Sequence, residues 1–296
     1  MRVISPRMDA QPLPIVRTVA ALRAQVGAWR ERGQTVALVP TMGALHEGHL
    51  SLVKMGRAQA DRVVVSVFVN PTQFGRGEDF EAYPRDEMAD ADLLRGAQAD
   101  IMYAPTPEEM YPAGFSTSIT VGGVSEGLCG DFRPGHFAGV ATVVAKLLTQ
   151  SVPDVAIFGE KDYQQLMVIR RLVRDLDLAV EVLGAPIVRE RDGLARSSRN
   201  AYLAAEERAK AAAMYAALKA AGARLLEGAS VTDVEAQGRA ALTAAGFGAI
   251  DYFEVRGEGD LARRGPGPIK GPSRVLAAAF LGRTRLIDNL AVANGG

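Results

Sequence analysis

The first part of the chain alternates between two hydrophobic patterns. Short unbroken apolar runs predict strands that are buried on both faces. Longer stretches with apolar residues at helical spacing separate these runs and predict helices. The predicted strands are residues 36–39, 63–69, 101–103, 155–158 and 180–183, and the predicted helices are residues 18–32, 50–60, 86–98, 137–149 and 163–176. Strands separated by helices predict right-handed βαβ units and a parallel sheet covered on both faces.

A different pattern begins near residue 190. Two helical stretches, the first rich in alanine, are followed by three strand patterns. They are residues 204–226 and 231–245, then residues 251–255, 274–281 and 284–287. The chain has 296 residues, which is enough for two domains. We therefore predict a loose leader over residues 1–14, a Rossmann-like domain over residues 15–189 and a small α+β domain over residues 190–296.

The composition of the chain argues against several classes of protein. Hydrophobic residues make up 48% and charged residues 23% of the chain, the formal net charge is zero, and no face rich in lysine and arginine is visible. Nucleic-acid binding is therefore not expected. No apolar run approaches the roughly 18 residues that span a bilayer, and no signal-peptide core is visible, so we expect a cytoplasmic protein. The single cysteine, Cys129, excludes an internal disulfide and a multi-cysteine metal site, and we expect it to be passive.

Two of the three histidines lie in one short string. His46 and His49 belong to PTMGALHEGH, residues 40–49, between a predicted strand and a predicted helix. The N-terminus of a helix has unpaired N–H groups and partial positive charge, so it attracts phosphate. Two imidazoles can donate to phosphate oxygens, and Gly43 and Gly48 let the backbone approach closely. Ordinary loop histidines are the alternative. The whole string favours a phosphate site and resembles the nucleotide-binding signature of the nucleotidylyltransferase superfamily, in which ATP is attacked at its α-phosphorus.

Three further polar strings are candidates for the same site. Asn70 and Gln73 follow the second predicted strand, and their amides can bind hydroxyls and carboxylates without charge. Residues 159–165 follow the strand at 155–158 and include a lysine that suits phosphate. Residues 191–200 form a polar loop with serines between arginines, which suits a polyphosphate. Taken singly, the first two are equally well explained as capped turns, and the third is better explained as a basic surface loop.

Together these strings resemble the pantoate–β-alanine ligase family. The matching strings, in the family's order, are PTMGALHEGH, FVNPTQF, RPGHF, GEKD, SSRN and LGRTRLIDN, at residues 40–49, 68–74, 133–137, 159–162, 197–200 and 281–289. The resemblance covers nearly the whole chain beyond the leader. It implies an α/β fold with a Rossmann-like nucleotidylyltransferase domain and a smaller C-terminal α+β lid, a homodimer, and a place in pantothenate and coenzyme A biosynthesis.

The resemblance also implies a two-step, ATP-dependent reaction. The carboxylate of pantoate attacks the α-phosphorus of ATP, which gives a bound pantoyl adenylate and pyrophosphate. The amine of β-alanine then attacks the acyl carbon, which gives pantothenate and AMP. The implied partners are therefore the small molecules ATP, pantoate and β-alanine, with Mg²⁺ accompanying the nucleotide. The sequence assigns no protein ligand to the metal.

The same resemblance assigns roles to residues. The expected catalytic residues are His46, His49 and Lys161, with His49 as the proton donor. The expected substrate-binding residues are Gln73, Gln165, Asn70 and Arg133. The expected ATP-binding residues are Met42, Gly43, Ala44, Leu45, His46, Glu47, Gly48, His49, Gly159, Glu160, Lys161, Asp162, Val188, Arg196, Ser197, Ser198 and Arg199. Arg133 and His136 either line the pantoate side or stabilise a loop.

Arg196 departs from the family's pattern, because an apolar residue, often methionine, generally stands there. We predict near-normal activity, with the Arg196 side chain facing solvent or phosphate. Three alternatives stay open. Another adenylyltransferase would share the histidine string without the strings around Gln73 and Lys161. An aminoacyl-tRNA synthetase would be longer and carry a basic anticodon-reading domain. A catalytically silent nucleotide-binding scaffold would have no need of both histidines, Lys161 and both glutamines.

Overall fold

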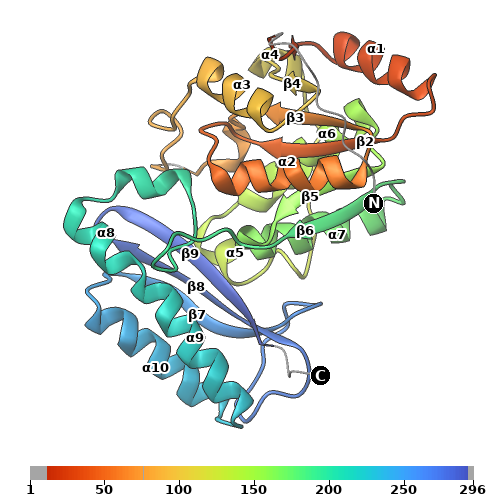
Figure 1. Cartoon of the computed structure of the whole chain (residues 1–296). Coiled ribbons are helices and arrows are strands. Elements are labelled where there is room, and N and C mark those ends of the chain that lie inside the picture. Colours follow the sequence, from red (N-terminus) through yellow and green to blue (C-terminus); the bar gives the residue numbers. More distant parts are fainter. Residues whose placement is uncertain (1–11, 76, 293–296) are drawn as a thin grey trace.

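The computed structural model describes residues 12–75 and 77–292 (Figure 1), so most of the predicted leader lies outside the described residues. Six strands form one parallel sheet in the order β1-β4-β3-β2-β5-β6. Their bounds are β1 Ile15–Val16, β2 Val36–Thr41, β3 Arg62–Val67, β4 Ile101–Tyr103, β5 Val155–Gly159 and β6 Glu181–Ala185. The predicted parallel α/β sheet is confirmed.

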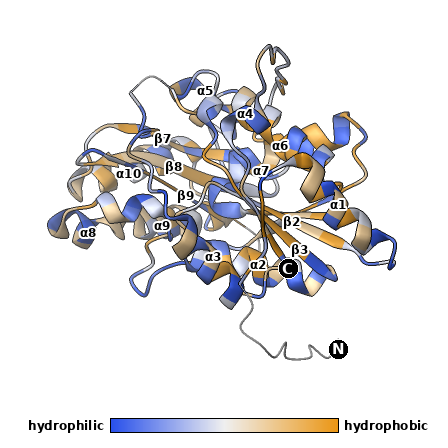
Figure 2. Cartoon of the chain, turned by 90° about the horizontal axis from the view of Figure 1, so that it is seen from above, coloured by the Kyte–Doolittle hydropathy of each residue, from blue (hydrophilic) through white to orange (hydrophobic). Residues whose placement is uncertain are grey.

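Helices cover both faces of this sheet. Their bounds are α1 Val19–Arg30, α2 Glu47–Gln59, α3 Glu87–Gly96, α6 His136–Ser151 and α7 Tyr163–Asp175. Successive residues of β2 point to opposite faces. Val36 and Leu38 pack with α1, α6 and α7, whereas Ala37 and Val39 pack with α2 and α3. The apolar run of β2 therefore fills two cores, and β2 and β3 stand out as hydrophobic in Figure 2.

The order of the strands reverses between β2 and β5. From β2 the chain builds outward through β3 to β4, and it then returns to place β5 against the other side of β2. The segments that leave the carboxyl ends of these two neighbouring strands diverge, which opens a crevice where ligands of such sheets bind. The histidine string follows β2, and the string that contains Lys161 follows β5. The topology thus brings the two strings together.

The C-terminal unit, residues 205–292, has three helices packed on one face of an antiparallel sheet, in the order β7-β8-β9. The bounds are α8 Ala205–Ala211, α9 Ala213–Leu226, α10 Val231–Ala244, β7 Ile250–Gly257, β8 Ser273–Leu281 and β9 Thr284–Val292. The single helix predicted over residues 204–226 is wrong, because the chain turns at Ala212. The sequence hides this break, since alanine favours helix on both sides of it.

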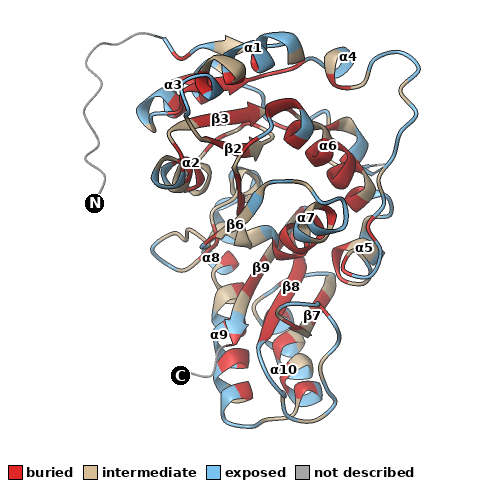
Figure 3. Cartoon of the chain, turned by 90° about the vertical axis from the view of Figure 1, so that its right-hand side faces the viewer, coloured by how far each residue is buried: buried red, intermediate tan, exposed pale blue. Residues whose placement is uncertain are grey.

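β9 is longer than predicted. The pattern ends at residue 287 because Asp288 and Asn289 interrupt the apolar alternation, yet both side chains are buried and the strand continues to Val292. β9 lies against two short 3₁₀ helices, η2 (Glu160–Asp162) and η3 (Ser198–Tyr202). Figure 3 shows buried residues along β8 and β9 up to the contact with the first part of the chain.

Two short helices, α4 (Pro107–Met110) and α5 (Cys129–Phe132), lie in the long connection between β4 and α6 and were not predicted. Cys129 is buried where α5 meets the C-terminal unit. Its sulfur lies 3.1 Å from the hydroxyl of Tyr252 and 3.6 Å from two nitrogens of Arg285. No helix within the described residues is both long and apolar enough to cross a membrane.

Candidate active site

The histidine string caps helix α2. The predicted helix start at residue 50 is too late, because α2 begins at Glu47 and His46 is its N-cap. Nδ1 of His46 accepts a hydrogen bond from the Gly48 N–H at 3.1 Å, and Nδ1 of His49 accepts one from the His46 N–H at 3.3 Å. A neutral imidazole whose Nδ1 accepts carries its proton on Nε2. The cap therefore leaves two Nε2–H donors on rings whose centroids are 4.1 Å apart.

Both imidazoles are neutral near pH 7. Burial lowers the pKa of His46 to about 4, and the nearby charges of Lys161 and Arg196 act in the same direction. Burial also lowers the pKa of His49 to about 3, with a further contribution from His46. These side chains therefore offer hydrogen bonds rather than fixed positive charge, until an anion binds beside them and favours the protonated form.

Asp90, on α3, holds the turn between β2 and α2 in place. Its buried carboxylate accepts hydrogen bonds from the N–H groups of Ala44 at 3.0 Å and Leu45 at 2.8 Å. The backbone is left-handed at Gly43 and Ala44, with φ of 82° and 51°. A Cβ on Gly43 would lie 2.8 Å from Oδ2 of Asp90. Sequence reasoning missed this role, although an aspartate on the apolar face of a helix is an available signal.

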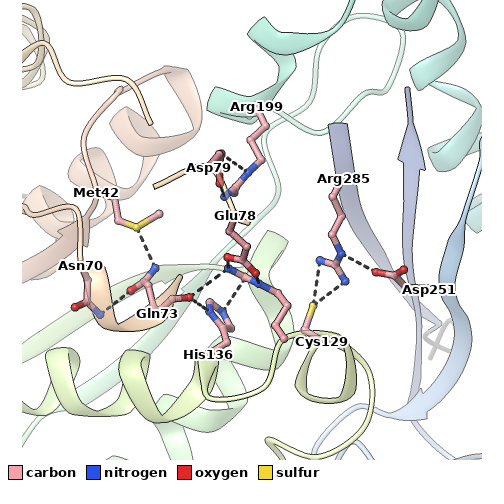
Figure 4. A network of polar contacts seen from close by, with 11 residues as sticks. Met42, Asn70, Gln73, Glu78, Asp79, Cys129, His136, Arg199, Asp251 and Arg285 are labelled. Carbon is pink, nitrogen blue, oxygen red and sulfur yellow. Dashed lines mark hydrogen bonds and ion pairs between the residues drawn. The ribbon is translucent and has the colours of Figure 1, made fainter. Parts of the chain in front are cut away.

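Gln73 belongs to a chain of amides that follows β3. It ends the short 3₁₀ helix η1 (Pro71–Gln73), and its Nε2 donates to the sulfur of Met42 at 3.0 Å. Its Oε1 accepts from Nδ2 of Asn70 at 3.1 Å (Figure 4), while Oδ1 of Asn70 accepts from the hydroxyl of Tyr111 at 2.7 Å. Asn70 is thus fully engaged by protein groups, and it fixes the orientation of the Gln73 amide.

Two neighbouring glutamines on α7 have different surroundings. Gln164 is buried, accepts from the N–H of Cys129 at 2.9 Å and donates to backbone carbonyls in the preceding loop. Gln165 lines the cavity, and among the described residues its side chain has no hydrogen-bond partner. Of the two, Gln165 is the one whose amide is available to a ligand.

Arg133 and His136 form a network around Gln73. Arg133 makes a two-pronged ion pair with Glu78, at 2.8 and 2.6 Å, and its NH1 lies 3.0 Å from Nε2 of His136. Nδ1 of His136 lies 2.8 Å from the carbonyl oxygen of Gln73. Burial, followed by the charge of Arg133, lowers the pKa of His136 to about 4. A neutral ring that donates from Nδ1 and accepts at Nε2 satisfies both contacts.

The two strings that are expected to contact phosphate, residues 159–162 and 196–199, line another part of the cavity. Lys161 lies in η2, with its Nζ 3.9 Å from a carboxylate oxygen of Asp162. Arg199 forms a two-pronged ion pair with Asp79, at 3.1 and 2.8 Å. Arg196 lines the cavity, and its charge reaches His46.

One cavity brings together most of the expected residues. Those lining it are Met42, His46, Gly48, His49, Asn70, Gln73, Arg133, Gly159, Lys161, Asp162, Gln165, Val188, Arg196, Ser197, Ser198 and Arg199. The expected residues outside this lining are Gly43, Ala44, Leu45, Glu47 and Glu160. Leu45 is part of the core, Glu47 is exposed, and Glu160 faces Arg274 of β8.

Sequence reasoning also missed an apolar wall of the cavity. Phe68 and, from one face of α6, Val140, Val143, Val144 and Leu147 line it. These positions follow ordinary helical spacing, so their pattern cannot distinguish a cavity wall from a core face.

Comparisons with known proteins identify the family of this chain. The family model "Pantoate-beta-alanine ligase" matches residues 14–291. Pantothenate synthetase of Rhodospirillum rubrum is 62% identical over 280 residues, covering 95% of this chain and 99% of the relative, and that of Caulobacter vibrioides is 60% identical over 279 residues, covering 94% and 98%.

Solved structures of similar fold come from the same family. Pantothenate synthetase from Thermus thermophilus superimposes with a TM-score of 0.89 at 48% identity, covering 95% of this chain and all of that one. Pantoate–β-alanine ligase from Francisella tularensis, described as complexed with "Beta-gamma ATP and Beta-alanine", has a TM-score of 0.75 at 30% identity over 96% and 99% of the two chains. This chain therefore belongs to the pantoate–β-alanine ligase family.

Proposed function

We propose that the cavity between β2 and β5 is where this ligase converts ATP, pantoate and β-alanine to pantothenate, AMP and pyrophosphate through a pantoyl adenylate. The proposal rests on one observation. Two neutral imidazole donors, a lysine and two uncharged amides line the same cavity at the switch point of the sheet. The first groups suit a polyphosphate, and the amides suit a hydroxy acid.

ATP is placed with its phosphates on the cap of α2. The Nε2–H groups of His46 and His49 point away from the contacts made by their Nδ1 atoms. Lys161 and the hydroxyls of Ser197 and Ser198 lie around the same cavity. Phosphoryl transfer requires mainly positioning and neutralisation of charge, and these groups provide both. His49 donates its hydrogen bond to oxygens that gain charge as pyrophosphate leaves.

Pantoate is placed between the amides and the apolar wall. Gln73 and Gln165 hold its polar groups, and the wall formed by α6 and Phe68 accepts its dimethyl carbon. An amide does not neutralise the carboxylate, so that group stays nucleophilic toward the α-phosphorus. Asn70 acts through Gln73, and Arg133 through the backbone carbonyl of Gln73 and through His136.

The second step uses the same geometry. Gln73 also lies near the place where β-alanine enters, and the amine attacks the acyl carbon while AMP leaves. Because the adenylate is hydrolysable, a site closed by the C-terminal unit protects it from water.

Magnesium fits the site as a companion of ATP. Within residues 12–75 and 77–292 there is no cluster of three or more His, Cys, Asp or Glu side chains that could hold a metal. Asp79 and Glu78 are paired with arginines, whereas Asp162 lines the cavity with half of its side chain exposed. Mg²⁺ is commonly bound by substrate phosphates and one or two carboxylates, so Asp162 is the residue that would hold it. When bound, it neutralises charge on the leaving pyrophosphate.

The family resemblance also leads us to propose a homodimer and a cytoplasmic location. Light scattering after size-exclusion chromatography tests the first, and fractionation of cells that express a tagged chain tests the second. A monomer across the working range of concentration would contradict the homodimer.

Exchange of labelled pyrophosphate into ATP tests the reaction. With pantoate and magnesium present and β-alanine absent, we expect exchange, since adenylate formation is reversible. Pantothenate formation without exchange would indicate a one-step ligase. Neither exchange nor AMP release on addition of β-alanine would contradict the proposed activity.

A further inference from the structure

Asn289, on β9, holds the turn that contains Lys161. The residue is 2% exposed, and its Nδ2 donates to the backbone carbonyls of Glu160 at 2.9 Å and Lys161 at 3.0 Å. Its Oδ1 accepts from NH1 of Arg274 at 2.5 Å. Because two successive carbonyls are fixed by one amide, the direction in which the Lys161 side chain leaves the backbone is fixed as well.

Asp288, the preceding residue, contacts the start of the loop that runs from Arg189 to residues 196–199. Its side chain is 4% exposed, and the carboxylate makes a two-pronged ion pair with Arg189 at 2.6 and 2.9 Å. Arg189 also donates to the Gly193 carbonyl at 3.0 Å. The Arg189 guanidinium lies 3.6 Å from the ring centroid of Tyr215 on α9. Arg189 begins the loop that leads to residues 196–199, so Asp288 fixes the base of that loop.

The two side chains reach different segments because neighbouring residues of a strand point to opposite faces. Asn289 is paired across the sheet with Leu276, which packs in the core of the first part of the chain. Asp288 is paired with Ala277, which packs in the core of the C-terminal unit. Asp288 and Asn289 together therefore connect the C-terminal sheet to two segments: the turn that contains Lys161 and the loop from Arg189 to residues 196–199.

The surrounding network is buried and polar. Arg274 is stacked 3.7 Å from the ring centroid of Tyr163, and its NH2 lies 3.4 Å from Glu160 and 3.2 Å from Glu258. Buried polar groups need matched partners, so such a contact tolerates few alternative arrangements. An apolar contact between the C-terminal unit and the first part of the chain would be less directional and would allow more relative positions of the two.

We propose that Asp288 and Asn289 are positioning residues for ATP: they fix the place of Lys161 and of residues 196–199 relative to the C-terminal sheet. This inference rests on the proposed function, since it requires Lys161 to bind the phosphates of ATP. Neither Asp288 nor Asn289 is among the described residues that line the cavity of the histidines, so both act through other residues.

Asn289→Asp is the sharpest test, because it keeps the shape of the side chain and removes the donor to both carbonyls. We expect KM for ATP to rise about tenfold, the effect of about one hydrogen bond, and KM for pantoate to change less than about twofold. Leu290→Ala is the matched control: it truncates a partly buried apolar side chain on the same strand, and Leu290 packs against the core of the C-terminal unit. The inference is overturned if Asn289→Asp leaves KM for ATP unchanged, or if Leu290→Ala, at an equal loss of Tm, raises it equally.

A double-mutant cycle with Lys161→Ala separates this inference from the proposed function. If Asn289 acts through Lys161, Asn289→Asp should have little further effect on kcat/KM for ATP in the Lys161→Ala background. Full additivity would overturn the inference while leaving the role of Lys161 intact. A Lys161→Ala enzyme with unchanged kcat/KM for ATP would instead refute the proposed role of Lys161, on which the inference depends.

Asp288→Asn tests the second segment. It leaves the Arg189 pair incomplete and should also raise KM for ATP, but its effect should add to that of Lys161→Ala because it acts on the other segment. Unchanged KM for ATP in a folded Asp288→Asn protein would overturn the part of the inference that concerns Asp288.

Discussion

The side-chain amide of Gln73 donates to the sulfur of Met42 at 3.0 Å, across the mouth of the crevice between η1 and the turn after β2. A thioether is a weak acceptor, so this contact costs little to exchange for a carboxylate or hydroxyl. The other end of the amide is fixed by Asn70. Gln73 is therefore oriented in advance, and its donor is available to pantoate.

Replacement of Gln73 by alanine should weaken pantoate use selectively. A hydrogen bond to a charged group contributes about 1.5–3 kcal/mol, which corresponds to about a 10- to 150-fold loss in kcat/KM for pantoate. KM for ATP should change little, because the side chain of Gln73 contacts Asn70 and Met42 and none of the groups proposed to hold the phosphates. Steady-state kinetics with each substrate varied in turn measures both values.

Gln164→Ala is a useful contrast, since Gln164 bonds only to protein groups among the described residues. It should lower Tm more than Gln73→Ala and should not change pantoate use selectively. Unchanged pantoate affinity and turnover in Gln73→Ala would remove Gln73 from the substrate site.

The sequence alone predicts the parallel sheet and the approximate site, because both depend on local patterns. Long apolar runs identify β2, β3 and β5, and polar strings directly after them mark one edge of the sheet. The supporting residues are harder to find. Asp90 and Asn289 act on backbone groups distant in sequence, and Asp288 acts on the side chain of the distant Arg189. In addition, buried polar residues in a strand resemble the end of that strand, as the shortened prediction for β9 illustrates.

The three histidines should make the protein less stable as the pH falls below about 6.5. The folded protein keeps them neutral, with pKa values of about 4, 3 and 4 for His46, His49 and His136. In the unfolded chain each titrates near 6.5, so between these values the unfolded state binds more protons. The free energy of unfolding should then fall toward low pH, by up to about 1.4 kcal/mol per pH unit for each histidine.

Urea unfolding at about pH 7, 6 and 5 measures this slope, above the range in which most carboxylates titrate. The double variant His46→Gln, His49→Gln loses the cap of α2 and should be less stable than the parent at pH 7, yet its slope should be much smaller than that of the parent. Equal slopes in the two proteins would contradict the neutral state assigned to these imidazoles.

Asp90→Asn should disturb the histidine turn from a distance. An asparagine side chain has one oxygen, so it can accept from only one of the N–H groups of Ala44 and Leu45. Its NH₂ group would face the other N–H, so about 1–3 kcal/mol of stability should be lost. Because the turn carries the cap of α2, kcat should fall as well, by about tenfold or more for a displacement of the catalytic groups. Asp86→Asn is the control on the same helix, since Asp86 is an exposed N-cap. Similar losses of activity in both variants would argue against a specific role for Asp90.

Arg196→Met, which restores the residue type more usual in the family, should weaken ATP binding. The Arg196 side chain lines the cavity, and its charge adds to burial and to the charge of Lys161 in lowering the pKa of His46. The guanidinium therefore lies where phosphates are proposed to bind. Loss of that partly exposed charge should raise KM for ATP by about two- to tenfold. Arg191→Met removes an exposed arginine from the same loop and should leave KM for ATP unchanged. A lower KM for ATP in Arg196→Met would show instead that the arginine disturbs the nucleotide site and that an apolar contact is preferred there.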